Sequence, residues 1–125
     1  MLKFHIMRKI NLLASAALFF CISSYNAQHV LVNDTDINKL DIEYCELSIS
    51  ARLVNPTKVK VYVDYGQKWS MKRQNIMNEN KKVVSFNSNV HALNFMNQNG
   101  WNYVEQTVTQ SGEQTIYKYL LKKSE

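Results

Sequence analysis

The chain has 125 residues, with 15 Lys and Arg against 10 Asp and Glu, and 46% of its residues are hydrophobic. This length suits one domain, and with one proline and three glycines the chain has no Pro- or Gly-rich linker. Three basic residues and no acidic ones precede residue 28, so the remainder carries a balance of only +2. Nucleic-acid binding, which needs many clustered basic residues, is therefore disfavoured.

Residues 1–27 have the pattern of a secretory signal peptide. A basic start, made by Lys3, Arg8 and Lys9, precedes an apolar run at 10–22 that is short for a permanent membrane-spanning helix. We expect cleavage after Ala27, with cleavage after Ser23 or Ser24 and a retained membrane anchor as alternatives. The sequence thus predicts a bacterial protein that is periplasmic or secreted and keeps no membrane span after cleavage.

The two cysteines bear on lipid attachment and on disulfides. A lipoprotein signal has a small residue directly before the cysteine that is lipidated. The large Phe20 stands at that position here, so it argues against lipidation of Cys21. After cleavage only Cys45 remains, so no internal disulfide can form. Cys45 alternates in phase with Leu47 and Ile49, which predicts a small buried hydrophobe; a reactive thiol or an intermolecular bridge is the alternative.

Residues 28–40 are mostly polar, and we expect either a mobile lead-in to a domain at 41–125 or a short edge element. Turn-forming residues around Asp34 and Asp36 make a single helical turn through Ile37 and Leu40 plausible. The two aspartates resemble half of a calcium loop, but the glycine and the later glutamate of an EF-hand are missing. We therefore expect no calcium site here.

Two alternating segments predict a first β-hairpin. From Ile42 to Val54 the odd positions from Cys45 to Leu53 are apolar and the even ones polar. Asn55-Pro56-Thr57 interrupts the pattern, and the alternation resumes from Lys58 to Tyr65 before Gly66.

Residues 68–82 do not follow a helical or a strand period, so a loop, a short helix and a short strand all stay open. A third short strand ending at Phe86 fits the apolar residues that follow. The cluster of Lys68, Lys72 and Arg73 around Trp69 could dock an anionic partner. We favour a simpler interpretation, a solvated basic face next to one buried tryptophan.

A helix followed by glycine is the clearest local signal. Asn87 or Ser88 can cap it, an apolar stripe follows at helical spacing, and Gly100 suits the left-handed position at its end. We expect Trp101 to contact Phe95 or Met96 and to close the helix end.

A second hairpin is predicted from Trp101 to Gln110 and from Gln114 to Lys122, joined by a Ser-Gly-Glu turn. Both of its faces carry large side chains. We therefore expect one face to pack on the helix and the other to meet a second layer, residues 68–82 or another subunit.

The stretch ALNFMNQNGWNYVEQ followed by IYKYLLKK resembles a group of small uncharacterised bacterial exported domains in which a helix joins a strand through Gly-Trp and the chain ends in a Leu-Leu-Lys-Lys strand. The resemblance covers roughly residues 43–123. It implies an antiparallel α+β domain and transfers no catalytic or binding residue. Asn89 and His91 depart from the apolar or acidic residues expected at their positions.

The sequence has few residues that suit catalysis or metal binding. Outside the signal segment the histidines are His29 and His91, and no Cys- or His-rich metal motif occurs. Four carboxylates lie mainly on outward strand positions, namely Glu43, Glu46, Asp64 and Glu105. We predict no catalytic residue, no cofactor and no metal.

The sequence therefore predicts an α+β domain with a small antiparallel sheet of four to five strands packed on one main helix in the order ββ(β)αββ. We interpret it as a non-enzymatic module that binds an unknown protein or envelope ligand through an aromatic sheet face. The candidate contacts are Tyr62, Trp69, Tyr103, Tyr117 and Tyr119, and the structural residues are Gly100, Trp101 and Cys45. The alternatives are a small envelope hydrolase or glycan-binding protein, and a structural homodimer formed by strand-edge pairing.

Overall fold

The computed structural model describes residues 28–125, so the predicted signal peptide lies outside the described residues. The elements in chain order are β1 (Leu31–Val32), β2 (Thr35–Asp36), the 3-10 helix η2 (Ile37–Lys39), β3 (Tyr44–Ala51), β4 (Val59–Asp64), β5 (Ile76–Met77), α2 (Asn89–Gln98), β6 (Trp101–Ser111) and β7 (Gln114–Lys123). No helix of this part of the chain is long and apolar enough to cross a membrane.

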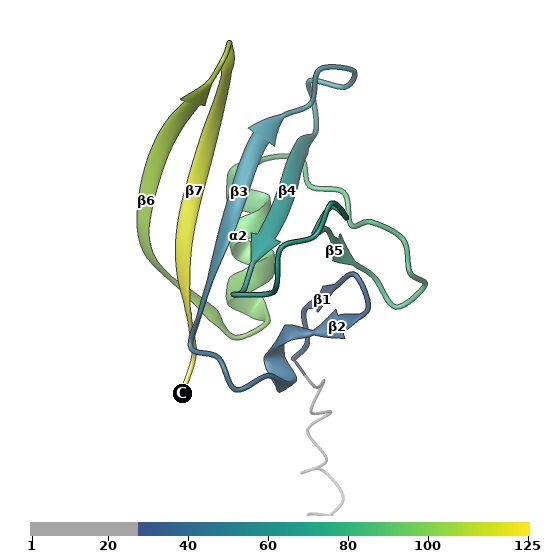
Figure 1. The fold of residues 1–125 in the computed structure, drawn as a ribbon, viewed down its shortest axis with the longest axis vertical. Coiled ribbons are helices and arrows are strands. Elements are labelled where there is room, and N and C mark those ends of the chain that lie inside the picture. Colours follow the sequence, from purple (N-terminus) through teal and green to yellow (C-terminus); the bar gives the residue numbers. More distant parts are fainter. Residues whose placement is uncertain (1–27) are drawn as a thin grey trace, which may run out of the picture.

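The predicted α+β class is confirmed, but the single sheet of four to five strands is wrong. The described strands form two antiparallel sheets, a larger one in the order β4-β3-β7-β6 and a smaller one in the order β2-β1-β5. Each strand of the smaller sheet has two residues, which is too short for alternation to reveal it. Figure 1 shows α2 lying across one face of the larger sheet, with the smaller sheet beside it.

The face of the larger sheet that packs on α2, called the inner face here, carries the core. Alternate residues of β3 are buried, including Cys45, Leu47 and Ile49, and Ile49 pairs with Val61 of β4. The predicted hairpin is therefore confirmed. β3 ends at Ala51, however, so Leu53, expected to point inward, is 87% exposed.

Residues 28–40 are part of the folded core rather than a lead-in to it. Val30, Val32 and Ile37 are fully buried in the same cluster as the inner-face residues. The Asp36 carboxylate accepts a hydrogen bond from the Asn38 N–H at 3.1 Å and caps η2, so the helical turn expected through Ile37 is confirmed.

The helix begins and ends as expected. Ser88 is the N-cap and accepts a hydrogen bond from the His91 N–H at 3.1 Å, and Gly100 follows the helix with φ of +88°. Trp101 is fully buried, and its indole Nε1–H donates to Asn38 Oδ1 at 2.7 Å. Trp101 therefore joins the end of α2 to the N-terminal elements, a contact that helix-end rules do not predict.

Residues 68–75 form a loop that leads into β5, where Ile76 is buried, and residues 78–82 form a turn after it. The predicted third strand ending at Phe86 is wrong, because that segment makes only isolated bridges, Met77 with Val83 and Val59 with Phe86. Trp69, expected to be buried, is 86% exposed. Sequence patterns do not show which of two tryptophans supplies the core, and here it is Trp101.

Candidate functional site

The five aromatic candidates do not share one face of the larger sheet. Tyr103, Tyr117 and Tyr119 lie on the inner face, where Tyr119 is 6% exposed and Tyr103 is 56% exposed. The Tyr119 hydroxyl accepts a hydrogen bond from Asn89 Nδ2 at 3.0 Å. Tyr119 is therefore a core residue that ties β7 to α2.

Tyr62 and Trp69 lie together on the opposite, outer face. Tyr62 is on β4, where it pairs with Ser48, and Trp69 is on the loop between β4 and β5. Both side chains line a shallow groove of about 340 Å³. Tyr62 also lines a second groove of about 470 Å³ beside β4, called the basic groove here.

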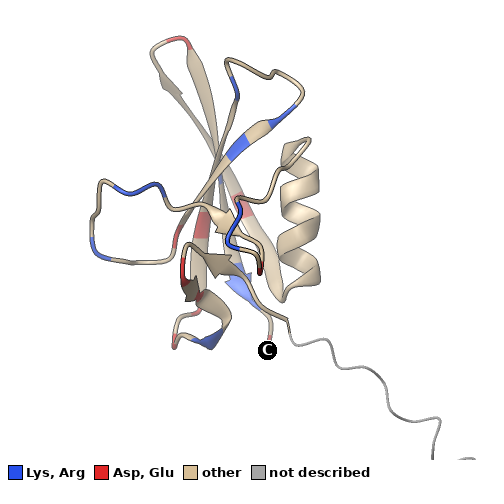
Figure 2. Cartoon of the chain, turned by 90° about the vertical axis from the view of Figure 1, so that its right-hand side faces the viewer, with Lys and Arg blue, Asp and Glu red and all other residues tan. Residues whose placement is uncertain are grey.

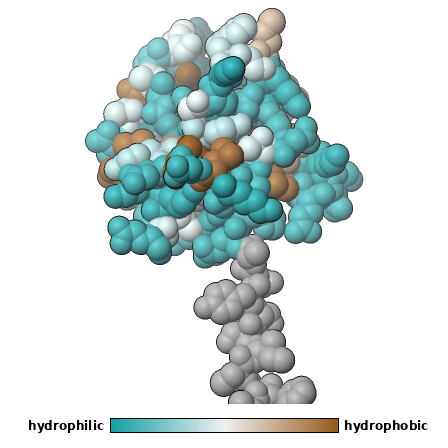
Figure 3. All heavy atoms as spheres, turned by 60° about the horizontal axis from the view of Figure 1, so that its bottom comes forward, coloured by the Kyte–Doolittle hydropathy of each residue, from teal (hydrophilic) through white to brown (hydrophobic). Residues whose placement is uncertain are grey.

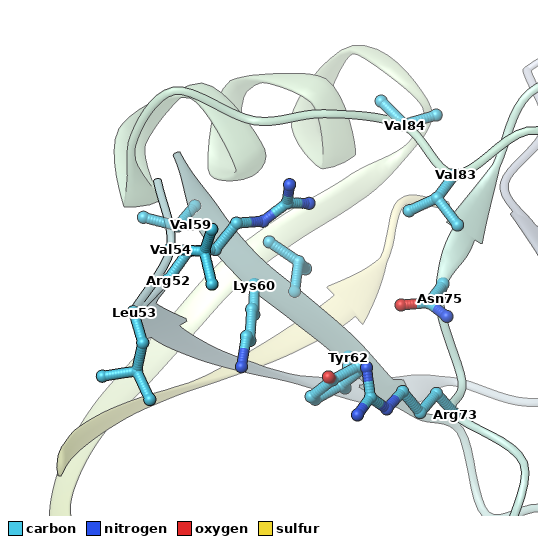
Figure 4. A pocket seen from close by; sticks show the side chains of 11 residues that line it. Arg52, Leu53, Val54, Val59, Lys60, Tyr62, Arg73, Asn75, Val83 and Val84 are labelled. Atoms are coloured by element: carbon cyan, nitrogen blue, oxygen red, sulfur yellow. The ribbon is translucent and has the colours of Figure 1, made fainter. Parts of the chain in front are cut away.

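The basic groove is lined by apolar and by cationic residues. Its apolar residues are Leu53, Val54, Val59, Val61, Val83 and Val84, and its cations are Arg52, Lys60 and Arg73. Figure 4 shows these side chains coming from β4, from the end of β3 and from the two segments that flank β5. Of the residues that the structure describes, no acidic one lines the groove.

The three cations have no partner within the described part of the chain. None of their charged groups makes a hydrogen bond or ion pair with residues 28–125, where the ion pairs are His29–Glu79, Lys72–Asp34 and Lys118–Glu46. Like charges that gather without a counter-charge raise the local positive potential and attract an anion. Figure 2 shows basic residues on the loop that joins β4 to β5, which carries Lys68 and Lys72 besides Arg73.

The backbone around Arg73 is held from two sides. Asn33 Nδ2 donates to the Arg73 carbonyl at 3.0 Å, and the Val63 N–H donates to the Gln74 carbonyl at 2.9 Å. Asn33 has φ of +54°, a conformation that asparagine tolerates better than most residues. The N-terminal hairpin therefore fixes the loop that presents Arg73 to the groove.

Several polar groups of the groove beside Trp69, including both of its glutamine amides, are already used by the chain. Gln67 accepts from the Tyr65 N–H at 2.7 Å and donates to the Val63 carbonyl at 3.0 Å. Gln74 Nε2 donates to the Lys72 carbonyl, and Asp64 Oδ1 accepts from the Gly66 N–H. This groove therefore offers an exposed indole and few free polar groups.

The carboxylates considered for catalysis do not converge in a cavity. Glu46 and Asp64 are cross-strand neighbours on the outer face, and Glu46 lies 3.8 Å from Lys118 Nζ. Of the carboxylates and His91, only Asp64 lines either groove. Among residues 28–125 no group of three or more His, Cys, Asp and Glu could hold a metal ion.

His91 and Cys45 both have local structural environments. His91 Nδ1 accepts a hydrogen bond from the Asn87 N–H at 3.1 Å, and its ring packs edge-on against Phe86 at 5.3 Å. Cys45 is 2% exposed, and burial raises the pKa of its thiol to about 12. A thiol with this pKa stays protonated at neutral pH and is a poor nucleophile.

Sequence reasoning named Tyr62 and Trp69 as candidate contacts, interpreted the basic cluster with Arg73 as a solvated face, and did not single out Arg52 and Lys60. Their outward positions in strand alternation indicated only solvated side chains. The groove depends on residues 73–75 and 83–84 folding back along β4, and no local pattern shows this contact. Comparison with known proteins finds no matching family model, no similar curated protein and no similar solved structure.

Proposed function

We propose that this protein is a binding module that takes an acidic, extended peptide segment of a partner protein in the basic groove. The observation that carries the proposal is the set of unpaired cations, Arg52, Lys60 and Arg73, that line one groove together with apolar residues. Guanidinium groups bind carboxylates through paired hydrogen bonds, and the valines accept the apolar side chains of the same segment.

The edge of β4 supports an extended ligand. Val59 and Val63 direct their N–H groups away from β3, to the carbonyls of Phe86 and Gln74 at 3.0 and 2.9 Å. Because backbone groups alternate along an antiparallel strand, Val61 also directs its N–H and C=O away from β3, next to the bridge by which Tyr62 pairs with Asn75. Val61 lines the basic groove, so an extended segment lying there runs beside this edge.

A glycan ligand is the second candidate, because Trp69 and Tyr62 present aromatic surface on the outer face. Sugar recognition also needs free polar groups near the rings, and the amides of Gln67 and Gln74 are engaged by the chain itself. The unpaired cations therefore favour the acidic peptide.

Two expectations from the sequence bear on where the partner would be found. The basic start and apolar run of residues 1–27 support export, so the partner would be an envelope or extracellular protein. The likeness to small exported bacterial domains supports the same compartment and supplies no ligand.

Calorimetric titration with a synthetic peptide that alternates glutamate and valine tests the proposal. We expect binding that weakens at high salt, and that weakens at least about tenfold, or about 1.4 kcal/mol, in an Arg52→Glu/Arg73→Glu variant. The matched control is Lys39→Glu/Lys82→Glu, which changes the net charge equally at exposed positions outside the groove.

The control variant should bind the peptide like the parent protein. A peptide with glutamine in place of glutamate should bind more weakly, because it lacks the charges that the arginines attract. Equal weakening in both double variants would indicate unspecific attraction and contradict the proposal. Salt-independent binding of neutral oligosaccharides that is lost in Trp69→Ala would favour the glycan alternative.

A further inference from the structure

The two edges of the larger sheet are protected differently. The β4 edge is covered at two points by the carbonyls of Phe86 and Gln74. At the β6 edge, residues 102–111 are all exposed, and within the described chain their backbone groups make no hydrogen bonds apart from those to β7. Figure 1 shows β6 as the outermost strand of the sheet.

The composition of β6 does not block pairing with another strand. Exposed edge strands are usually protected by Lys, Pro, short length or bulges. β6 spans 11 residues and contains no Lys, Arg or Pro, and its one charged residue is Glu105. Its only protective feature is the register shift between Tyr103 and Glu105, which leaves Val104 as the extra residue of a bulge.

The bulge defines a register for pairing with a second copy. Regular pairing can extend from Glu105 to Ser111, and Val108 is the middle residue of this segment. An antiparallel arrangement around that centre sets Val108 against the second copy's Val108 and Thr107 against the second copy's Thr109. Such β-branched cross-strand pairs are favourable.

The same register avoids repulsion between the copies. Glu105 falls opposite the second copy's Ser111, so the two carboxylates do not face each other. Gln106 falls opposite the second copy's Gln110, and paired amides can bond to each other. This register thus sets no like charges opposite each other and lets the edge backbone groups of the two strands pair.

We propose that this protein forms a homodimer in which two β6 strands pair antiparallel about Val108 and join the two larger sheets into one. This inference does not depend on the proposed function, because β6 and β4 are opposite edges of the sheet. In such a dimer the two basic grooves lie at the far ends of the joined sheet. A partner with two acidic segments would then bind with increased avidity.

Sedimentation velocity over a concentration series, on protein expressed from the full-length sequence, tests the dimer. Val108 is 53% exposed, so Val108→Lys leaves the core intact and sets two lysines against each other at the two-fold axis. We expect a reversible dimer in the parent protein and at least a tenfold increase in its dissociation constant in Val108→Lys. The matched control, Val104→Lys, changes a valine that is 46% exposed in the bulge and should dimerise normally.

A parent protein that stays monomeric throughout the series would overturn the proposal. So would a dimer that Val108→Lys leaves intact or that Val104→Lys weakens equally, since the contact would then lie elsewhere. Near-ultraviolet circular dichroism of each variant confirms that the fold is kept.

Disulfide trapping tests the register directly. In a Cys21→Ser background the remaining native thiol is the buried Cys45. Val108→Cys should form a disulfide-linked dimer under mild oxidation, because the two new thiols face each other. Thr107→Cys alone should form it at least tenfold more slowly, and equal rates would contradict pairing about Val108.

Discussion

Cys45 illustrates how burial fixes the chemistry of a single residue. The pKa of the Cys45 thiol is raised to about 12, mainly by burial and also by the nearby Asp64 carboxylate, while Lys123 opposes the shift. In the unfolded chain the pKa of a cysteine thiol is about 8.5. The folded state therefore keeps a proton that the unfolded state loses between these values.

The sign of the pH dependence follows from that difference. The stabilisation is complete below the unfolded pKa and is lost as the pH rises towards about 12. We predict that the free energy of unfolding falls more steeply above about pH 9 in the parent protein than in Cys45→Ala, by up to about 1.4 kcal/mol per pH unit. Denaturant titrations of both proteins at several pH values measure the two slopes. Parallel curves would show that the buried thiol does not contribute.

Gly100 carries the backbone conformation that ends α2. Its φ is +88°, and a Cβ added there would lie 2.8 Å from Gln28 Oε1. We predict that Gly100→Ala destabilises the fold by about 1–2 kcal/mol, since an L residue in this conformation is strained. Gly112→Ala is the control, because Gly112 has φ of +64° with nothing within 4 Å of the added Cβ. Thermal melting should show the larger loss at Gly100, because its φ lies further from the left-handed region near +50 to +70° that L residues can reach. The Gln28 side chain is exposed and can move aside, so an equal loss would mean that the larger φ adds no strain.

At the level of elements, the N-terminal segment is the part that sequence reasoning misjudged. Long alternating strands and a capped helix have clear sequence patterns, so the sequence predicts the β3–β4 hairpin, the β6–β7 hairpin and α2. β1, β2 and β5 have two residues each, and their polar neighbours are typical of loops. Their place in the fold depends on contacts with residues far away in the sequence, and the spacing of apolar residues does not predict such contacts.

Asn38 shows how these contacts tie the N-terminal segment to the rest of the molecule. It accepts from the Trp101 indole N–H at 2.7 Å and donates to the Asn99 carbonyl at 2.8 Å. Lys123 Nζ donates to the Leu40 carbonyl at 2.7 Å and lies 5.5 Å from the centre of the Trp101 ring. Three distant parts of the chain therefore meet around one tryptophan.

We predict that a chain beginning after Ile37 does not fold, whereas a chain beginning at Gln28 does. The shorter chain loses Val30, Val32 and Ile37, all fully buried, and each such side chain contributes about 1.5–3 kcal/mol. Their combined loss is comparable with the whole stability of a small domain, about 5–15 kcal/mol. Amide chemical-shift dispersion of the two chains checks this, and a well-dispersed spectrum from the shorter chain would contradict it.

The loop that presents Arg73 depends on the β1–β2 turn. We predict that Asn33→Gly, which keeps the positive φ but removes the side-chain donor, weakens binding of the glutamate–valine peptide about three- to tenfold. The melting temperature should change little, because these hydrogen bonds lie near the surface. Calorimetry and thermal melting separate the two effects, and unchanged affinity would show that the hydrogen bonds do not position Arg73.

At the level of the whole molecule, charge and apolar surface are distributed unevenly. The surface seen from the end that carries the N-terminal elements is mostly hydrophilic with small apolar patches (Figure 3). The basic groove beside β4 differs from it, since its lining combines apolar residues with cations that have no acidic partner among residues 28–125. The candidate site could be predicted only in part, because Arg73 belongs to a basic cluster in one loop, while Arg52 and Lys60 join Arg73 through the fold.

Mapping of backbone amide shifts during titration with the glutamate–valine peptide tests the central claim most directly. We predict that the largest shifts fall on β4 around Val61, on residues 73–75 and on Val83 and Val84, which together line the basic groove. Shifts concentrated on β6, on the inner face or around the N-terminal elements, with these residues unmoved, would contradict the account.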